Sequence, residues 1–244
     1  MPQAERLTQF EKALLGLRSL VMSGEFRASE RLPEVTVAER LGISRTPLRQ
    51  AMDRLVAEGL LERIGSGGCR VASFTIDDIM DAIEVRGVIE GTAARMAAER
   101  GADETLLAEA DEILAGLDVA LTGPQAVDFD AYVRLNEAFH DLLARLPGSA
   151  VIEREAKRVC NQPLASPSSF LQGQELIPDF QTSLIRAQHQ HRELIAAIRA
   201  REGARAEALA REHARLARQN FGYVINTVPS LAPRVPGLSL VTAD

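Results

Sequence analysis

The sequence predicts a mainly α-helical protein, with an N-terminal winged helix-turn-helix followed by an all-α antiparallel helical bundle. Three features of the 244 residues indicate this fold. Ala, Leu, Arg and Glu, most of which favour helices, are abundant. A short helix, a glycine turn and a second helix are predicted around Gly42, and a glycine-rich hairpin follows them. Beyond residue 75, Gly and Pro separate amphipathic segments, as expected for a bundle.

The second helix of the predicted helix-turn-helix begins at Ser44, whose hydroxyl can accept from the free N–H groups of the first turn. Pro47 falls within that turn, where a missing N–H costs nothing. Arg45 and Arg49 are four residues apart and therefore share the face opposite the apolar one. Two guanidinium groups near a helix N-terminus suit phosphates and guanine edges. The alternative is a helical hairpin that only packs, with both arginines as solvated charges.

Flanking segments complete a predicted DNA-binding domain over residues 1–74. A first helix is expected over about 4–22, and a short second helix over 35–41 ends at Gly42 in the left-handed conformation. Residues 60–64 and 69–72 are expected to form the strands of a wing. The turn between them needs positive φ, and its glycines would let the backbone approach a groove. A plain hairpin turn is the alternative interpretation.

A second, all-helical domain is predicted over residues 75–228. Thr75–Asp78 has a capping-box pattern that opens its first helix. Residues 161–179 contain several prolines and are expected to be irregular, as a lid, a dimer contact or a loop. Residues 229–244, with three prolines, are expected to form a disordered or loosely docked tail. The helices of this domain are predicted over 77–100, 103–121, 126–146, 149–160, 181–201 and 203–226.

The helix-turn-helix is similar to that of GntR-type bacterial transcriptional regulators. The resemblance is carried by Leu41-Gly42-Ile43-Ser44-Arg45-Thr46-Pro47-Leu48-Arg49, then Leu55, Glu58-Gly59-Leu60 and the Gly-rich hairpin. It implies a homodimer that binds double-stranded operator DNA, with contacts from the recognition helix and from the wing tip. The implied DNA-binding residues are Ser44, Arg45, Thr46, Arg49 and Gly67.

Three of the four histidines lie on apolar faces of predicted helices: His140, His191 and His213. His189 is off its apolar stripe and is expected to be exposed. One inward histidine is usually a satisfied core residue. Three in one bundle, with Asn136 one turn before His140, favour a divalent metal ion, because buried imidazoles need partners and one ion satisfies several.

This pattern resembles the FCD-type ligand-binding domain of the FadR-like branch of GntR regulators. The resemblance covers about residues 5–222 together with the N-terminal domain. It implies a divalent ion, zinc or nickel, held by Asn136, His140, His191 and His213. The branch commonly has an acidic ligand where this chain has Asn136, so a lower metal affinity is expected. A site without that charge should also favour an anionic ligand at its open positions.

Arg86 is expected to face inward, because it falls in line with Ile79 and Ile83 on its helix. A buried arginine needs an anion. Glu90, one turn later, and the carboxylate of an effector are the two candidates. An arginine at this place often lies at the effector pocket in the resembling branch, which implies effector binding by Arg86 and a small carboxylate as the effector.

The charge is unevenly distributed: residues 1–74 carry a balance of +2 and the remainder −8, which together give −6. A localised basic face on an acidic dimer is compatible with site-specific DNA binding. Cys69 and Cys160 fit no metal or redox spacing and are expected to be reduced thiols in a cytoplasm. No apolar run approaches the roughly 20 residues that span a membrane, and no signal pattern opens the chain. A cytoplasmic protein without a membrane partner is expected.

The expected function is therefore a DNA-binding transcriptional regulator whose operator affinity is controlled by a small organic acid, bound in a metal-containing helical domain. A metal-dependent hydrolase fused to a nucleic-acid-binding module is the main alternative. A hydrolase needs a general base beside the metal, but no His-Glu-x-x-His helix occurs and Glu137 lies off the ligand face. No catalytic residue is expected, and the protein is not expected to be an enzyme. A third possibility is an architectural DNA-binding dimer without a sensor.

Overall fold

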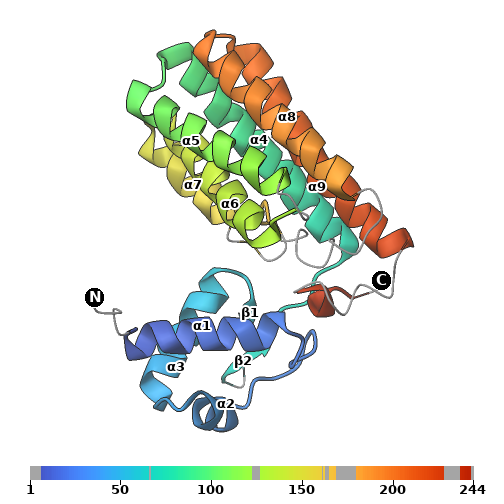
Figure 1. Ribbon diagram of the computed structural model, residues 1–244. Helices are drawn as coiled ribbons and strands as arrows, with labels where there is room; N and C mark the ends of the chain where they lie inside the picture. The colour runs from blue at the N-terminus through green and yellow to red at the C-terminus, as the bar shows by residue number, and fades with distance from the viewer. Residues whose placement is uncertain are drawn as a thin grey trace. The chain divides into compact units, whose positions relative to one another are not determined.

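The computed structural model describes residues 7–65, 67–122, 127–160, 162, 165–168, 180–227 and 237–242. The chain divides into two compact units (Figure 1). One comprises Met1–Asp78 and Pro236–Asp244, and the other comprises Ile79–Val235. The predicted fold class is confirmed, because the described residues are mainly α-helical and a small hairpin is present in the first unit.

The first unit contains three helices and a two-stranded antiparallel sheet. These elements are α1 (Gln9–Met22), α2 (Glu34–Leu41), α3 (Arg45–Ala57), β1 (Leu61–Arg63) and β2 (Cys69–Val71). Gly42 closes α2 with φ 62°, in the predicted left-handed conformation. The expected start of the first helix at residue 4 was too early. Thr8 is an extended N-cap that forms a capping box with Glu11, so α1 begins at Gln9.

The core of the first unit lies between the apolar faces of its helices and the sheet. Leu17 and Val21 of α1 and Leu48 and Leu55 of α3 are fully buried. Leu32, from the connection between α1 and α2, joins the same cluster. Burying one leucine side chain contributes roughly 1.5–3 kcal/mol. This packing fixes α3 with its apolar face inward and its Arg45–Arg49 face toward solvent.

The second unit is built from helices of the antiparallel bundle. They are α4 (Ile76–Arg100), α5 (Glu104–Leu121), α6 (Phe129–Arg145), α7 (Ala150–Cys160), α8 (Phe180–Arg199) and α9 (Gly203–Thr227). Each observed boundary lies within three residues of its prediction. The largest difference is at α6, which starts at Phe129 because the Asp128 side chain accepts from Ala131 N.

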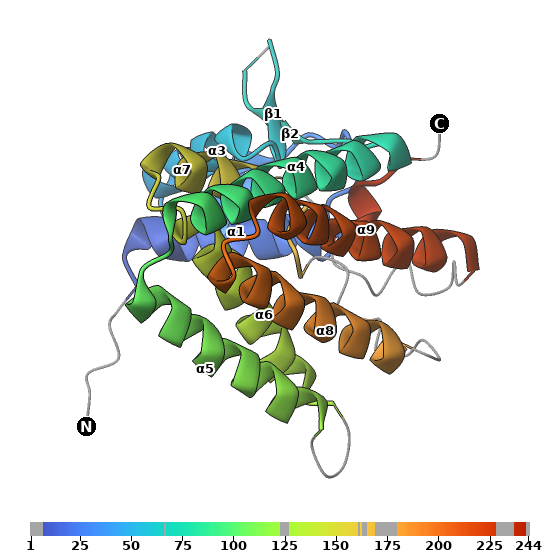
Figure 2. The ribbon, with the colours of Figure 1, turned by 90° about the horizontal axis from the view of Figure 1, so that it is seen from above.

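Helices α8 and α9 run side by side, and α5 contacts both α6 and α8 (Figure 2). Helix α4 packs closely on α9 through glycine. A Cβ atom on Gly87 would lie 2.8 Å from Ala214 Cβ, so any larger residue would push the two helices apart. The close packing around α9 places one face of each of α4, α6, α8 and α9 near the same buried region.

Within the described residues, no helix is long and apolar enough to cross a membrane. Most of the expected irregular segment 161–179 lies outside the described residues. Part of the expected tail is described: Leu238–Leu240 form a 3-10 turn, η3, that packs on the first unit. Leu240 is fully buried in the core of that unit.

Candidate metal centre and DNA-binding face

The face of α3 opposite the core carries the predicted DNA-binding residues. Ser44, Arg45, Thr46 and Arg49 are all exposed, and the side chains of both arginines retain about 60% of their accessible surface. Gly67 is exposed at the wing, with φ 93°. A groove in this unit is lined by residues of α2, α3 and the wing, including Arg45, Arg49 and Gly67. The structure thus brings the predicted residues of the helix and wing to one face.

Two residues of this face were not predicted from the sequence. Glu34, at the start of α2, accepts a hydrogen bond from Arg49 Nε at 2.9 Å and lies 3.9 Å from an Arg45 nitrogen. Arg31 donates to Gly67 O at 3.0 Å and therefore adds a cation beside the wing. No periodic pattern in the sequence marked Arg31, because this residue lies in the connection before α2. Its position depends on the hairpin folding back onto that connection.

Ser44 is the N-cap of α3, as predicted, and has extended backbone angles. However, its side chain makes no capping hydrogen bond. The hydroxyl therefore does not serve the helix end in the way the sequence suggested. It remains on the exposed face beside Arg45, where it can donate to a phosphate oxygen.

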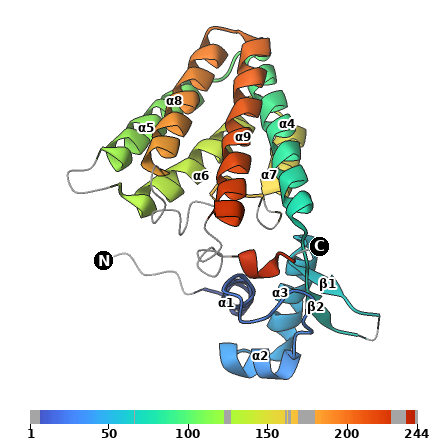
Figure 3. The ribbon, with the colours of Figure 1, turned by 90° about the vertical axis from the view of Figure 1, so that its right-hand side faces the viewer.

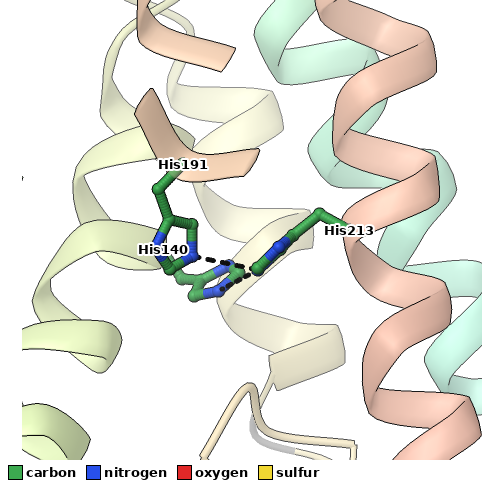
Figure 4. A group of neighbouring side chains, drawn as sticks. All are labelled: His140, His191 and His213. Atoms are coloured by element: carbon green, nitrogen blue, oxygen red, sulfur yellow. Dashed lines mark hydrogen bonds between the residues drawn. The ribbon is translucent and has the colours of Figure 1, made fainter. Parts of the chain in front are cut away.

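Three buried histidines from different helices meet inside the second unit (Figure 4). His140 comes from α6, His191 from α8 and His213 from α9. The Nε2 atoms of His191 and His213 are 3.0 Å apart, and those of His213 and His140 are 3.4 Å apart. One ligand atom from each residue lies within 4.8 Å of the others. The three predicted imidazoles therefore converge on one point, whereas His189 is exposed, as expected.

The other ring nitrogen of each histidine faces a side-chain oxygen. Nδ1 of His140 lies 2.7 Å from Glu90 Oε1. Nδ1 of His191 and of His213 lies 3.2 Å from the amide oxygens of Gln188 and Gln190, respectively. The amide nitrogen of Gln188 donates to Leu114 O and to an Asp118 carboxylate oxygen, which directs its oxygen to the ring. Such acceptors fix the tautomer and orientation of metal-binding imidazoles.

If Nδ1 of each ring donates to its oxygen, the three Nε2 atoms carry lone pairs that face one another at the distances above. Burial opposes the charge on Glu90, but His140 and Arg86 outweigh it and lower the Glu90 pKa to about 2, so this group is an acceptor. Burial and the neighbouring histidines lower the pKa of His213 to about 3 and that of His191 well below its ordinary value. These two imidazoles are thus neutral at neutral pH and can act as metal ligands. A bound cation would remove the repulsion, and an imidazole set suits zinc or nickel.

Asn136 is buried one turn before His140, and its amide nitrogen donates to Ser168 Oγ at 3.3 Å. It borders a cavity of about 40 Å³ together with His140 and His213. A water molecule needs roughly 10–15 Å³ by this measure, so the cavity has room for a few non-hydrogen atoms. The cavity is also lined by Arg86, Tyr132, Pro167, Ser183, Leu184, Ala187, Leu216, Ala217 and Asn220.

Arg86 is buried, as the sequence predicted, and it borders this cavity. It donates to Ala165 O at 2.7 Å, and its Nε lies 3.8 Å from Glu90 Oε2. The sequence offered Glu90 as the partner of Arg86, but the short contact of Glu90 is with His140. Among the residues that the structure describes, Nε of Arg86 and Oε2 of Glu90 find no hydrogen-bond partner. These two atoms face each other in a long ion pair, so Glu90 balances part of the charge of the buried guanidinium.

Neither cysteine belongs to the described histidine cluster, and both are free thiols. Cys69 is buried in the core of the first unit, and burial raises its pKa. Burial also raises the pKa of Cys160 to about 12. Both thiols therefore stay protonated at neutral pH.

Comparison with known proteins agrees with the two-unit fold. Residues 11–71 match the gntR family of bacterial regulatory proteins, and residues 81–216 match the FCD domain. The HTH-type transcriptional repressor GlaR of Escherichia coli (strain K12) is 28% identical over 201 residues, which cover 81% of this chain and 88% of GlaR. The Nta operon transcriptional regulator of Aminobacter aminovorans is 33% identical over 129 residues, or 52% of this chain and 58% of that protein.

Solved structures show the same fold at low sequence identity. E. coli McbR/YncC covers 91% of this chain and all of its own, with a TM-score of 0.67 and 19% identity. A winged helix-turn-helix followed by an FCD bundle defines a class of bacterial transcriptional regulators. This chain belongs to the GntR family of bacterial regulatory proteins and is a transcriptional regulator with an FCD domain. Members of this family bind operator DNA.

Proposed function

We propose that the protein is a homodimeric regulator whose affinity for operator DNA is controlled by a small carboxylate bound beside a metal ion in the FCD domain. The observation that supports a metal ion is the convergence of three histidines through their Nε2 atoms. The Nδ1 atom of each ring faces a side-chain oxygen. His140, His191 and His213 would hold the ion, with the Asn136 amide oxygen as a weaker fourth ligand. The ion would supply a positive centre that attracts an anion.

The cavity beside the three histidines supports a small anionic effector. Its described lining includes no carboxylate side chain and one guanidinium, that of Arg86. Desolvating a carboxylate is tolerable only where opposite charge is present. The guanidinium of Arg86, which lines the cavity and forms a long ion pair with Glu90, and the proposed ion meet that need. Ser183 Oγ donates to Asn220 Oδ1 at 3.0 Å on the same lining, which offers polar groups to a hydroxylated acid.

The same lining argues against the hydrolase. A hydrolytic metal site needs a general base that can reach a bound water. Glu90 is the carboxylate nearest to the cluster, and it is held by His140 as an orienting acceptor. Glu137 is exposed, off the ligand face. Control of DNA binding therefore accounts for the site better than turnover does.

Calorimetry with a panel of mono- and dicarboxylates tests the effector. The panel should include one acid that binds metal-loaded wild-type protein and weakens its operator binding. Arg86→Lys and metal stripping should each weaken that acid by at least tenfold, since each removes a positive group or its geometry. Lys keeps the charge near Glu90 and so preserves folding better than Ala. An acid that binds equally well to all three forms would place the effector elsewhere.

A further inference from the structure

The winged-helix unit has a surface that the chain's own C-terminal segment covers. The surface lies at the C-terminal end of α1 and along Phe74, and η3 lies beside α1 (Figure 3). Leu240 is fully buried, with 0% of its surface accessible to solvent, and Leu238 retains only 8% of its accessible surface. Ser239 between them is exposed. The segment therefore buries two leucines, of which Leu240 joins the core of the unit, and leaves Ser239 exposed to solvent.

Backbone hydrogen bonds fix the register of this segment. Phe74 N donates to Leu240 O at 2.9 Å, and Thr242 N donates to Phe74 O at 2.9 Å. Phe74 and Val241 thus form a parallel bridge. Gly237 N donates to Met22 O at 2.9 Å, at the end of α1. Gly237 has φ 84°, a conformation that favours glycine.

Phe74 occupies a special place in the chain, because it lies between β2 and α4, in the linker that leads from the DNA-binding unit to the bundle. Both of its backbone hydrogen-bonding groups are used by the C-terminal segment. Without that segment, the linker would exchange these bonds for water and gain backbone freedom. The chain therefore connects the two units at two points, once after Phe74 and once before Gly237.

We propose that this surface is a docking surface for residues 237–242 and that the docked segment clamps the linker at Phe74 to the winged-helix unit. The clamp limits the freedom of the linker and so favours operator binding. The contacts all lie within the winged-helix unit, so the inference does not depend on the metal or the effector. It assigns a role to part of a tail that the sequence predicts to be disordered or loosely docked.

Truncation after Val235 tests the clamp in the otherwise intact protein. Hydrogen exchange in α1 near Met22 and in residues 72–75 should become faster by about tenfold or more, because the docked state no longer protects them. Metal affinity should stay unchanged, and operator affinity should fall. A shorter truncation that removes only Ala243 and Asp244 is the matched control and should behave as wild type.

A synthetic peptide of residues 236–244 separates docking from general damage. Added to the truncated protein, it should restore protection at residues 72–75, whereas the same peptide with Leu240→Asp should not. Leu240→Ser in the full chain is the alternative test if the truncated chain does not fold. It should show the same faster exchange. Unchanged exchange in both variants would overturn the docking, and unchanged operator affinity despite faster exchange would overturn the role of the clamp in DNA binding.

Discussion

Arg45 and Arg49 lie one turn apart on an exposed helix face, yet Glu34 already pairs with both. DNA must therefore compete with a carboxylate for the two guanidinium groups. Exposed ion pairs of this kind contribute roughly 0–1 kcal/mol, less than a bidentate contact with guanine offers. The pairing holds the two side chains near the groove without preventing their transfer to DNA.

The first prediction follows from this geometry. Arg45→Ala or Arg49→Ala should each reduce operator affinity by about 1–3 kcal/mol if the side chain reads a base. Arg54→Ala is the matched control, because Arg54 lies later on α3 and pairs with Glu58. Gel-shift titration at fixed salt measures the effect. Equal affinities for the wild type and a folded Arg45→Ala, Arg49→Ala double variant would remove both residues from the interface.

The second prediction concerns the metal ligands. Purified protein should take up one zinc- or nickel-like ion per chain, and His213→Ala should abolish this uptake. Asn136→Asp should tighten binding, since a charged oxygen replaces an amide. His189→Ala should have no effect, because His189 is exposed outside the cluster. Elemental analysis after loading decides the matter: a wild type without stoichiometric metal would mean that the three imidazoles are core residues.

The third prediction concerns Glu90, which supplies the negative charge nearest to the cluster. Glu90→Gln keeps an oxygen for His140 Nδ1 but removes the charge, so metal affinity should fall by roughly 10–100-fold. Glu84→Gln, on the exposed side of the same helix, is the control. Competition with a chromophoric chelator measures both affinities. If Glu90→Gln binds metal as tightly as wild type, the carboxylate serves only Arg86 and packing.

At the scale of the elements, two helix N-termini that look alike in sequence differ in structure. Thr8 caps α1 through its hydroxyl, whereas Ser44 begins α3 without such a bond. Thr8→Ala should therefore destabilise the protein by about 0.5–2 kcal/mol with little effect on DNA affinity. Ser44→Ala should leave the stability of the protein nearly unchanged and should reduce its affinity for DNA. Thermal unfolding and gel shifts of both variants test the pair, and a large loss of stability in Ser44→Ala would show that its hydroxyl does cap the helix in solution.

The elements themselves were predictable, because apolar periodicity and Gly or Pro punctuation mark each of them locally. The inward positions of His140, His191 and His213 followed from the same periodicity. The orienting residues Gln188 and Gln190 did not. Their partners depend on how α8 rotates against α5 and α9, which no local pattern records. The hydrogen bond between Arg86 and Ala165 could not be predicted from the sequence either, since Ala165 lies in an irregular segment.

The contacts of the C-terminal segment were also not predictable from local sequence patterns. Its prolines indicated a disordered or loosely docked tail, whereas both leucines are buried and Leu240 joins a core far away in the sequence. Two leucines separated by one exposed serine are too short a pattern to predict docking. Such long-range burial becomes visible only when the surface that receives the segment has been assembled.

At the scale of the whole molecule, the proposed homodimer presents two copies of α3 to DNA. Two-fold symmetry then requires an inverted repeat whose half-sites face the same side of the duplex. Because B-DNA turns once in about 10–10.5 base pairs, the distance between half-sites determines whether both copies of Arg45 and Arg49 reach their grooves together.

This geometry gives the last prediction. Inserting about 5 base pairs between the half-sites rotates one of them by half a turn, so only one recognition helix can bind its groove. Affinity should fall toward that of a single half-site. An insertion of about 10 base pairs restores the facing but lengthens the span, so recovery measures how far the linkers allow the two DNA-binding units to separate. Truncation after Val235, which frees the linker at Phe74, should improve this recovery relative to the full chain. Equal affinity for all three spacings would mean that each chain binds its half-site independently and that the operator is not read by a dimer.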